Sequence, residues 1–117
     1  MTVESQVVEV VPHEQVLLVR VLPRRLDTGK AEELENAVSH AVLARPAVPL
    51  VLDLSAVKFA PSIALGVFVN MLRGMNMSNR KAFFVGVNHQ LRGTLAVTRL
   101  DAMITVRESL EQVLREL

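Results

Sequence analysis

The sequence contains no cysteine, no tryptophan and no tyrosine, and these absences exclude several kinds of protein. Without cysteine the chain forms no disulfides and has no thiolate chemistry, which fits a reducing compartment. Aromatic residues make up 3% of the chain, so the core must be built from valine, leucine, alanine and methionine. The same scarcity argues against a surface that stacks single-stranded nucleic acid on aromatic rings.

The chain also lacks a charge excess and a long apolar segment. Its 13 basic and 12 acidic residues give a net charge of +1. No basic tract stands out beyond Arg20, Arg24 and Arg25, so we expect no nucleic-acid partner. No apolar run approaches the ~18 residues of a membrane helix, and we expect no direct membrane insertion. Residues 1–11 lack the basic and apolar regions of a signal peptide, so we expect a cytoplasmic protein.

What the sequence does contain predicts a single α/β domain over residues 1–117, with half of its residues hydrophobic (50%). Valine-rich and leucine-rich segments predict strands at 3–11, 15–22, 49–54, 82–87 and 102–105. Helical spacing of apolar residues predicts helices at about 29–45 and 62–75, a short one after Asn88 and a last one after 105. The order is β-β-α-β-α-β-α-β-α. The initial hairpin makes the sheet mixed, because strands joined through helices run parallel.

Capping residues and apolar stripes support the predicted helices. Asp27 or Thr28 caps the first helix, Asn88 caps the third, and Thr105 with Glu108 has the spacing of a capping box for the last. Three stripes recur at helical spacing. They are Leu34, Ala37, Val38, Ala41 and Val42; then Ala64, Val67, Phe68, Met71, Leu72 and Met75; and finally Leu110, Val113, Leu114 and Leu117.

The most informative segment for function is 59–66, which follows the most apolar predicted strand and opens a helix at Ser62. One interpretation makes Ser62 an N-cap whose oxygen accepts a backbone N–H. The other makes it a phosphoacceptor, because a helix N-terminus tolerates the added negative charge while a partner packed there does not. Asp53, at the end of the preceding strand, either orients a nearby group or bonds to the loop backbone.

No other pattern predicts chemistry. His13, His40 and His89 have neither the spacing of a metal site nor a carboxylate cluster beside them. The spacing of serine, histidine and aspartate residues along the sequence does not indicate a catalytic Ser/His/Asp arrangement. We therefore expect no catalytic residues, no metal and no cofactor, and a protein that is not an enzyme.

The whole chain resembles a STAS domain of the anti-sigma-factor antagonist type. The resemblance rests on Arg25-Leu26-Asp27, on the segment 50–57 with Asp53, on 59–66 in the place of the switch motif, on 84–87, on 91–101 and on 109–114. The family's usual switch motif is Asp-Ser-Ser-Gly-Leu-Gly, and the matching residues here are Pro61-Ser62-Ile63-Ala64-Leu65-Gly66. Stressosome-type members are phosphorylated on the hydroxyl residue directly after the aspartate, and that match points to Ser62.

The resemblance implies a mixed sheet with its helices packed on one side. It also implies a regulatory protein that binds an anti-sigma factor, itself a serine kinase, or stressosome-type proteins. Phosphorylation at the start of the second helix would break that contact. The expected partner-binding residues are Asp53, Pro61, Ser62, Ile63, Leu65, Arg24 and Arg25. An alternative is a phosphorylation-independent STAS module, acting as a scaffold or as a subunit of a membrane lipid-transport ATPase. A homodimer through an exposed sheet edge or helix surface is left open.

Overall fold

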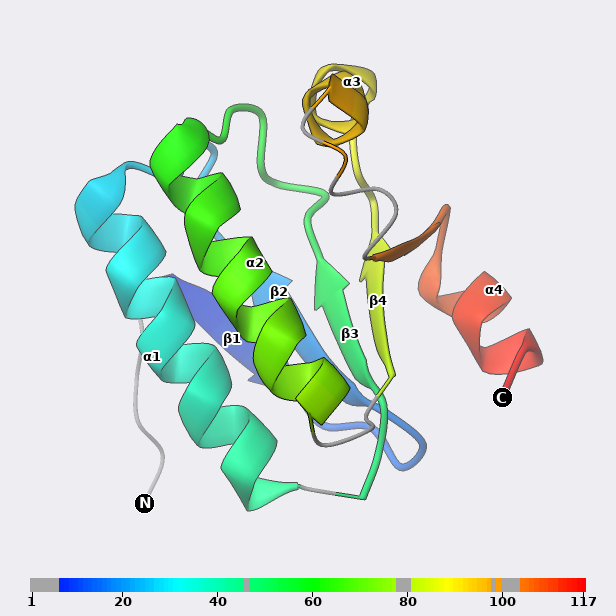
Figure 1. The fold of residues 1–117 in the computed structure, drawn as a ribbon. Coiled ribbons are helices and arrows are strands. Elements are labelled where there is room, and N and C mark those ends of the chain that lie inside the picture. The colour runs from blue at the N-terminus through cyan, green and yellow to red at the C-terminus, as the bar shows by residue number, and fades with distance from the viewer. Residues whose placement is uncertain (1–6, 46, 78–80, 98, 100–103) are drawn as a thin grey trace.

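The structure, a computed structural model, describes residues 7–45, 47–77, 81–97, 99 and 104–117 (Figure 1). Nine helices and strands occur in these residues, in the order expected from the sequence. They are β1 (Val8–Val11), β2 (Leu17–Val21), α1 (Thr28–Ala44), β3 (Leu50–Asp53), α2 (Ser62–Met77), β4 (Ala82–Val85), α3 (His89–Val97), β5 (Thr105–Arg107) and α4 (Leu110–Arg115).

The five strands form one mixed sheet in the order β1-β2-β3-β4-β5. β1 pairs antiparallel with β2, and the pairs from β2 to β5 are parallel. The predicted mixed sheet is therefore confirmed. The last strand lies later than expected, because Thr105 pairs with Phe83 and the ladder continues to Arg107. The expected strand residues 3–6, 102 and 103 lie outside the described residues.

Helices α1 and α2 lie side by side over one face of the sheet (Figure 1). Leu34 and Val38 of α1 are buried there, as are Ala64 and Phe68 of α2. The ring of Phe68 meets the ring of Phe84 on β4 edge to face, with 5.4 Å between their centroids. These contacts confirm the apolar stripes predicted for both helices, although the side chains of Leu72 and Met75 lie outside the described ones.

The last helix corrects the expectation that all helices share one side. Val113 of α4 is buried in a second cluster, with Val16, Leu18, Val51, Phe83 and Val85. Leu18, Val51, Phe83 and Val85 alternate along their strands with residues that face α1 and α2, so they point to the opposite face of the sheet. The central strands are apolar on both faces, and α4 covers part of the second face.

The predicted capping box at Thr105 and Glu108 is wrong. Ser109 is the N-cap of α4, and its hydroxyl accepts from the backbone N–H of Gln112 at 3.3 Å. Thr105 is held in β5 by its pairing with β4, so it cannot open the helix. For α1, Asp27 rather than Thr28 is the cap, and its carboxylate accepts from the N–H of Lys30 at 3.0 Å.

An ion pair joins β5 to the end of α4 and makes this corner of the fold sensitive to acid. Arg107 donates through Nε and Nη2 to the two carboxylate oxygens of Glu116, at 2.5 and 2.8 Å. Hydrogen bonding from Arg107 lowers the pKa of Glu116 below its usual 4.5. A depressed folded-state pKa means that the unfolded chain binds more protons, so the stabilisation is present above the usual pKa. It is lost as the pH falls through the lowered one.

We therefore expect Glu116→Gln to lower the free energy of unfolding at neutral pH. The difference from wild type should narrow as the pH falls below the usual pKa of Glu116 and close below its lowered pKa. Urea unfolding at a series of pH values measures this gap. The matched control is Glu111→Gln, an exposed residue in the first turn of the same helix. If the difference in the free energy of unfolding between wild type and Glu116→Gln did not change with pH, the ion pair would contribute nothing to stability.

Candidate functional site

Three connecting loops meet at the carboxyl edge of the parallel strands. They follow β2, β3 and β4 and lead into α1, α2 and α3. All three helices therefore begin at the same edge, at the top of Figure 1. The carboxyl edge of parallel strands is where binding groups gather in α/β sheets, because the loops there are free of the sheet's own packing.

The first two of these loops are bonded to each other through their backbones. The carbonyl oxygen of Arg24 accepts from the N–H groups of Lys58 and Phe59, at 2.7 and 3.0 Å. The N–H of Leu26 donates to the oxygen of Phe59 at 3.1 Å, which completes a parallel bridge between Arg25 and Phe59. The structure thus brings the predicted residues Arg24 and Arg25 beside the loop that leads into α2.

The third loop is tied to the second by a side chain. Asn88 donates from Nδ2 to the carbonyl oxygen of Val57 at 3.0 Å. Its Oδ1 accepts from the N–H of Leu91 at 2.7 Å, which confirms Asn88 as the cap of α3. The sequence predicted the cap, but the bond to Val57 joins residues 31 positions apart and has no local signal. Together these bonds hold all three loops in one rigid edge.

Asp53 ends β3 and bonds to the start of its loop. Its Oδ1 accepts from both the N–H and the hydroxyl of Ser55, and its Oδ2 lies 3.7 Å from Nε of Arg20. Of the two interpretations of Asp53, bonding to the loop backbone is therefore confirmed. The carboxylate is partly buried in these contacts.

Gly86 allows the third loop to approach this carboxylate closely. Its φ is +70°, a region that residues with a Cβ rarely adopt. A Cβ at this position would lie 2.2 Å from Oγ of Ser55 and 3.1 Å from Oδ1 of Asp53. Sequence reasoning missed this role, because a glycine after a strand indicates a turn and not what the turn touches.

The start of α2 differs from that of the other helices. The carbonyl oxygen of Pro61 accepts from the N–H groups of Ala64 and Leu65, at 2.9 and 3.3 Å. Pro61 therefore occupies the N-cap position, and Ser62 is the first residue of the helix. The interpretation of Ser62 as the N-cap is wrong for this reason. The side chains of Ser62 and Ile63 lie outside the described ones.

The remaining expected contact residue is mostly inside the protein. Leu65 is 7% exposed and belongs to the core cluster under α1 and α2, so its side chain offers little surface to a partner. Phe59, which was not among the expected contact residues, is 42% exposed at the same edge. The sequence did contain a signal for Phe59, because a phenylalanine in a predicted loop is unusual in a chain with so few aromatic residues.

The described residues contain no group of three or more histidine, cysteine, aspartate or glutamate side chains that could hold a metal ion. In the same part of the chain, no helix is both long enough and apolar enough to cross a membrane. What the carboxyl edge does offer is a rigid, partly apolar surface with exposed cations, which is suited to protein binding.

Comparisons with known proteins identify the family of this domain. A family model, described as the STAS domain, matches residues 7–113. The chain belongs to the STAS domain family. The search of curated proteins found no match.

Solved structures of similar proteins extend the comparison. An anti-sigma factor antagonist from Mycobacterium paratuberculosis is 27% identical, with 93% of this chain and 91% of that chain covered and a TM-score of 0.80. An anti-sigma-factor antagonist (STAS) domain protein from Planctomyces limnophilus is 18% identical, covers 93% and 95% of the two chains and has a TM-score of 0.81. RsbS from Moorella thermoacetica is 18% identical, covers 96% and 94%, and has a TM-score of 0.80. At 18% identity the last two show the shared fold alone.

Proposed function

We propose that this protein is a non-enzymatic anti-sigma-factor antagonist that binds an anti-sigma factor through the carboxyl edge of its sheet. The observation that carries the proposal is the carboxyl edge itself, in which three loops are hydrogen-bonded to one another around the start of α2. A preorganised surface of this kind loses little conformational entropy when a partner binds. Family membership and the similarity to an anti-sigma factor antagonist support the same conclusion.

Phosphorylation of Ser62 is the proposed control of this contact. Ser62 is the first residue of α2, and the N-terminus of a helix favours negative charge. The protein itself would therefore tolerate a phosphate there. A partner packed against the edge would have to accommodate about two added negative charges without a matching cation.

The residue before Ser62 favours a second candidate function. Pro61 stands where the family's usual motif has an aspartate, and Ile63 stands where it has its second serine. Proline provides neither a charge nor a backbone donor at the entrance to the helix. A STAS module that binds without phosphorylation, as a scaffold or as a subunit of a membrane lipid-transport ATPase, is consistent with this departure.

A pull-down from the native cytosol, analysed by mass spectrometry, tests the proposal. Recovery of an anti-sigma factor with a serine-kinase domain supports the first function, and recovery of transporter subunits supports the second. The same measurement reports whether Ser62 carries phosphate. Absence of any anti-sigma factor from the recovered proteins would contradict the first function.

The Ser62→Asp variant is expected to bind the recovered anti-sigma factor roughly a hundredfold more weakly than wild type, while Ser62→Ala binds normally. The physical reason is the unmatched negative charge at the buried contact. Calorimetric titration measures both affinities, and Ser39→Asp on the exposed side of α1 is the matched control. Equal binding by Ser62→Asp and Ser62→Ala would rule out the switch and leave the binding role intact.

A further inference from the structure

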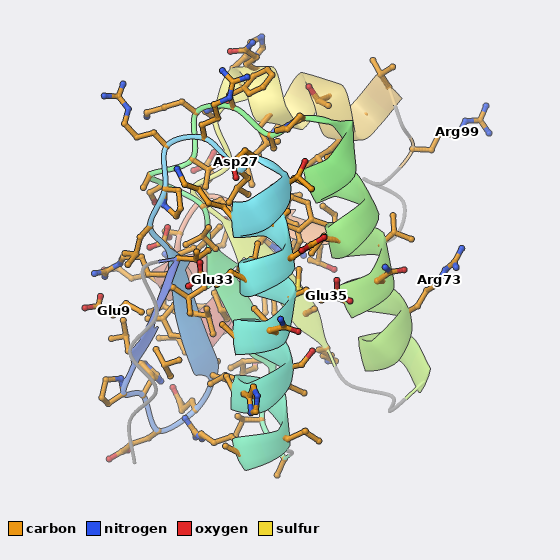
Figure 2. The ribbon with its side chains drawn as sticks, turned by 90° about the vertical axis from the view of Figure 1, so that its left-hand side faces the viewer. Glu9, Asp27, Glu33, Glu35, Arg73 and Arg99 are labelled. Carbon is orange, nitrogen blue, oxygen red and sulfur yellow. The ribbon has the colours of Figure 1, made fainter. Side chains whose placement is uncertain are left out.

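Charge is divided unevenly along this chain although its sum is close to zero. No aspartate or glutamate occurs between Leu54 and Leu100, a stretch that contains Lys58, Arg73, Arg80, Lys81, Arg92 and Arg99. Three of the 12 acidic residues, Glu32, Glu33 and Glu35, lie close together on α1. Figure 2 shows Glu33 and Glu35 on α1, and Arg73 pointing outward from α2. The loops that lead into α2 and α3 therefore belong to the acid-free part of the chain.

Three exposed cations lie together where the first two loops are bonded. Arg24 and Arg25 come from the loop after β2, and Lys58 comes from the loop after β3. The backbone bonds from Lys58 and Phe59 to Arg24 hold these residues side by side. The ion pairs found in the described residues use other cations, namely Arg20, Lys30 and Arg107. We call Arg24, Arg25, Lys58 and Phe59 the basic patch.

Phe59 gives the basic patch an apolar centre and orients one of its cations. The guanidinium carbon of Arg25 lies 4.7 Å from the centroid of the Phe59 ring. A guanidinium stacked on a ring keeps its N–H donors free in its own plane, where they can bind a carboxylate through two hydrogen bonds. The ring is 42% exposed, so it also offers apolar surface to a bound side chain.

We propose that the basic patch binds an acidic segment of the partner protein, with carboxylates on Arg24, Arg25 and Lys58 and an apolar side chain beside Phe59. The identity of the partner, an anti-sigma factor, rests on the proposed function. The chemistry of the segment rests on the patch alone. An anionic membrane is a poorer match, since membrane recognition uses clusters of about 4–8 lysines and arginines.

Binding of synthetic peptides, followed by amide NMR shifts of the labelled protein, tests this chemistry. The probe is a peptide that alternates glutamate with leucine, and its control has glutamine in place of each glutamate. The acidic peptide is expected to shift the amide signals of residues 22, 24–27 and 57–60, and added salt is expected to weaken its binding. Equal shifts with the glutamine peptide, or binding only to vesicles of anionic lipid, would overturn the proposal.

Charge reversal provides the second test. Arg25→Glu is expected to weaken binding of the acidic peptide about tenfold or more. The substitution replaces a guanidinium donor by a carboxylate, which repels the carboxylates of the peptide. The matched control, Arg73→Glu, makes the same change at an exposed position in the second half of α2 and should alter the affinity by less than about twofold. Phe59→Ala should weaken binding of the leucine-containing peptide. It should have less effect on the binding of a peptide with glycine in place of leucine.

The two proposals fail separately. If the anti-sigma factor binds wild type and Arg25→Glu equally well, the acidic-segment proposal is wrong and the proposed function stands. If no anti-sigma factor is recovered while the acidic peptide binds at the basic patch and depends on Arg25, the proposed function is wrong and the chemistry of the patch stands.

Discussion

Replacing Phe68 by alanine is expected to lower the free energy of unfolding by about 3–5 kcal/mol, the usual cost of truncating a buried phenylalanine. Phe68 is fully buried under α2, and its ring packs edge to face against Phe84 at 5.4 Å. Truncation removes the apolar contacts of the ring and leaves a cavity between α2 and the sheet. Since small domains are stable by only about 5–15 kcal/mol, the loss is a large part of the total.

Urea unfolding followed by far-ultraviolet circular dichroism measures this loss. Phe59→Ala is the matched control, because it deletes the same atoms from a ring that is 42% exposed. It should cost about 1 kcal/mol or less. If the two variants were equally stable, Phe68 would not anchor α2 as the structure indicates. The comparison bears on function, because Phe68 fixes the helix that begins at Ser62.

Gly86→Ala is expected to destabilise the protein by about 2–4 kcal/mol through two additive effects. The first is backbone strain, since alanine must adopt the φ of +70° that glycine adopts here. The second is a collision, because the added Cβ would lie 2.2 Å from Oγ and 3.0 Å from the backbone nitrogen of Ser55. The hydroxyl can rotate away only by giving up its bond to Asp53.

A double-variant comparison separates the two effects. In a Ser55→Ala background the collision with Oγ is absent, so Gly86→Ala should cost less there and retain the strain. Gly93→Ala in α3 is the control, with open space around its Cβ position. It should leave stability unchanged or raise it by up to about 1 kcal/mol. An equal effect of Gly86→Ala and Gly93→Ala would exclude both the strain and the collision.

The order of the elements could be predicted because its signals are local. The stripe around Leu34 and Val38 and the caps at Asp27 and Asn88 need only a few neighbouring residues to be recognised. The position of α4 could not be predicted in the same way. The stripe of Leu110 and Val113 indicates that one side of the helix is buried, but not which face of the sheet covers it.

The candidate site shows the same division between local and distant signals. Ser62 was correctly placed at the start of a helix, yet its assignment as N-cap failed. The carbonyl oxygen of Pro61 begins the helix by accepting from the N–H groups of Ala64 and Leu65, although proline has no side-chain acceptor to mark it as a cap in the sequence. The contacts that make the edge rigid, such as Asn88 to Val57 and Gly86 to Ser55, join segments far apart in sequence. Periodicity within a segment holds no information about them.

The uneven distribution of acidic and basic residues has a consequence for the speed of association. A protein with a net charge of +1 still has an electric dipole moment when three glutamates lie together on α1 and the stretch from Leu54 to Leu100 carries basic residues without any acidic one. The field of a charged molecule exerts a torque on such a dipole and turns the protein during approach. Encounters then occur preferentially in one orientation, and their rate constant falls as ionic strength rises, although the total charge is nearly zero.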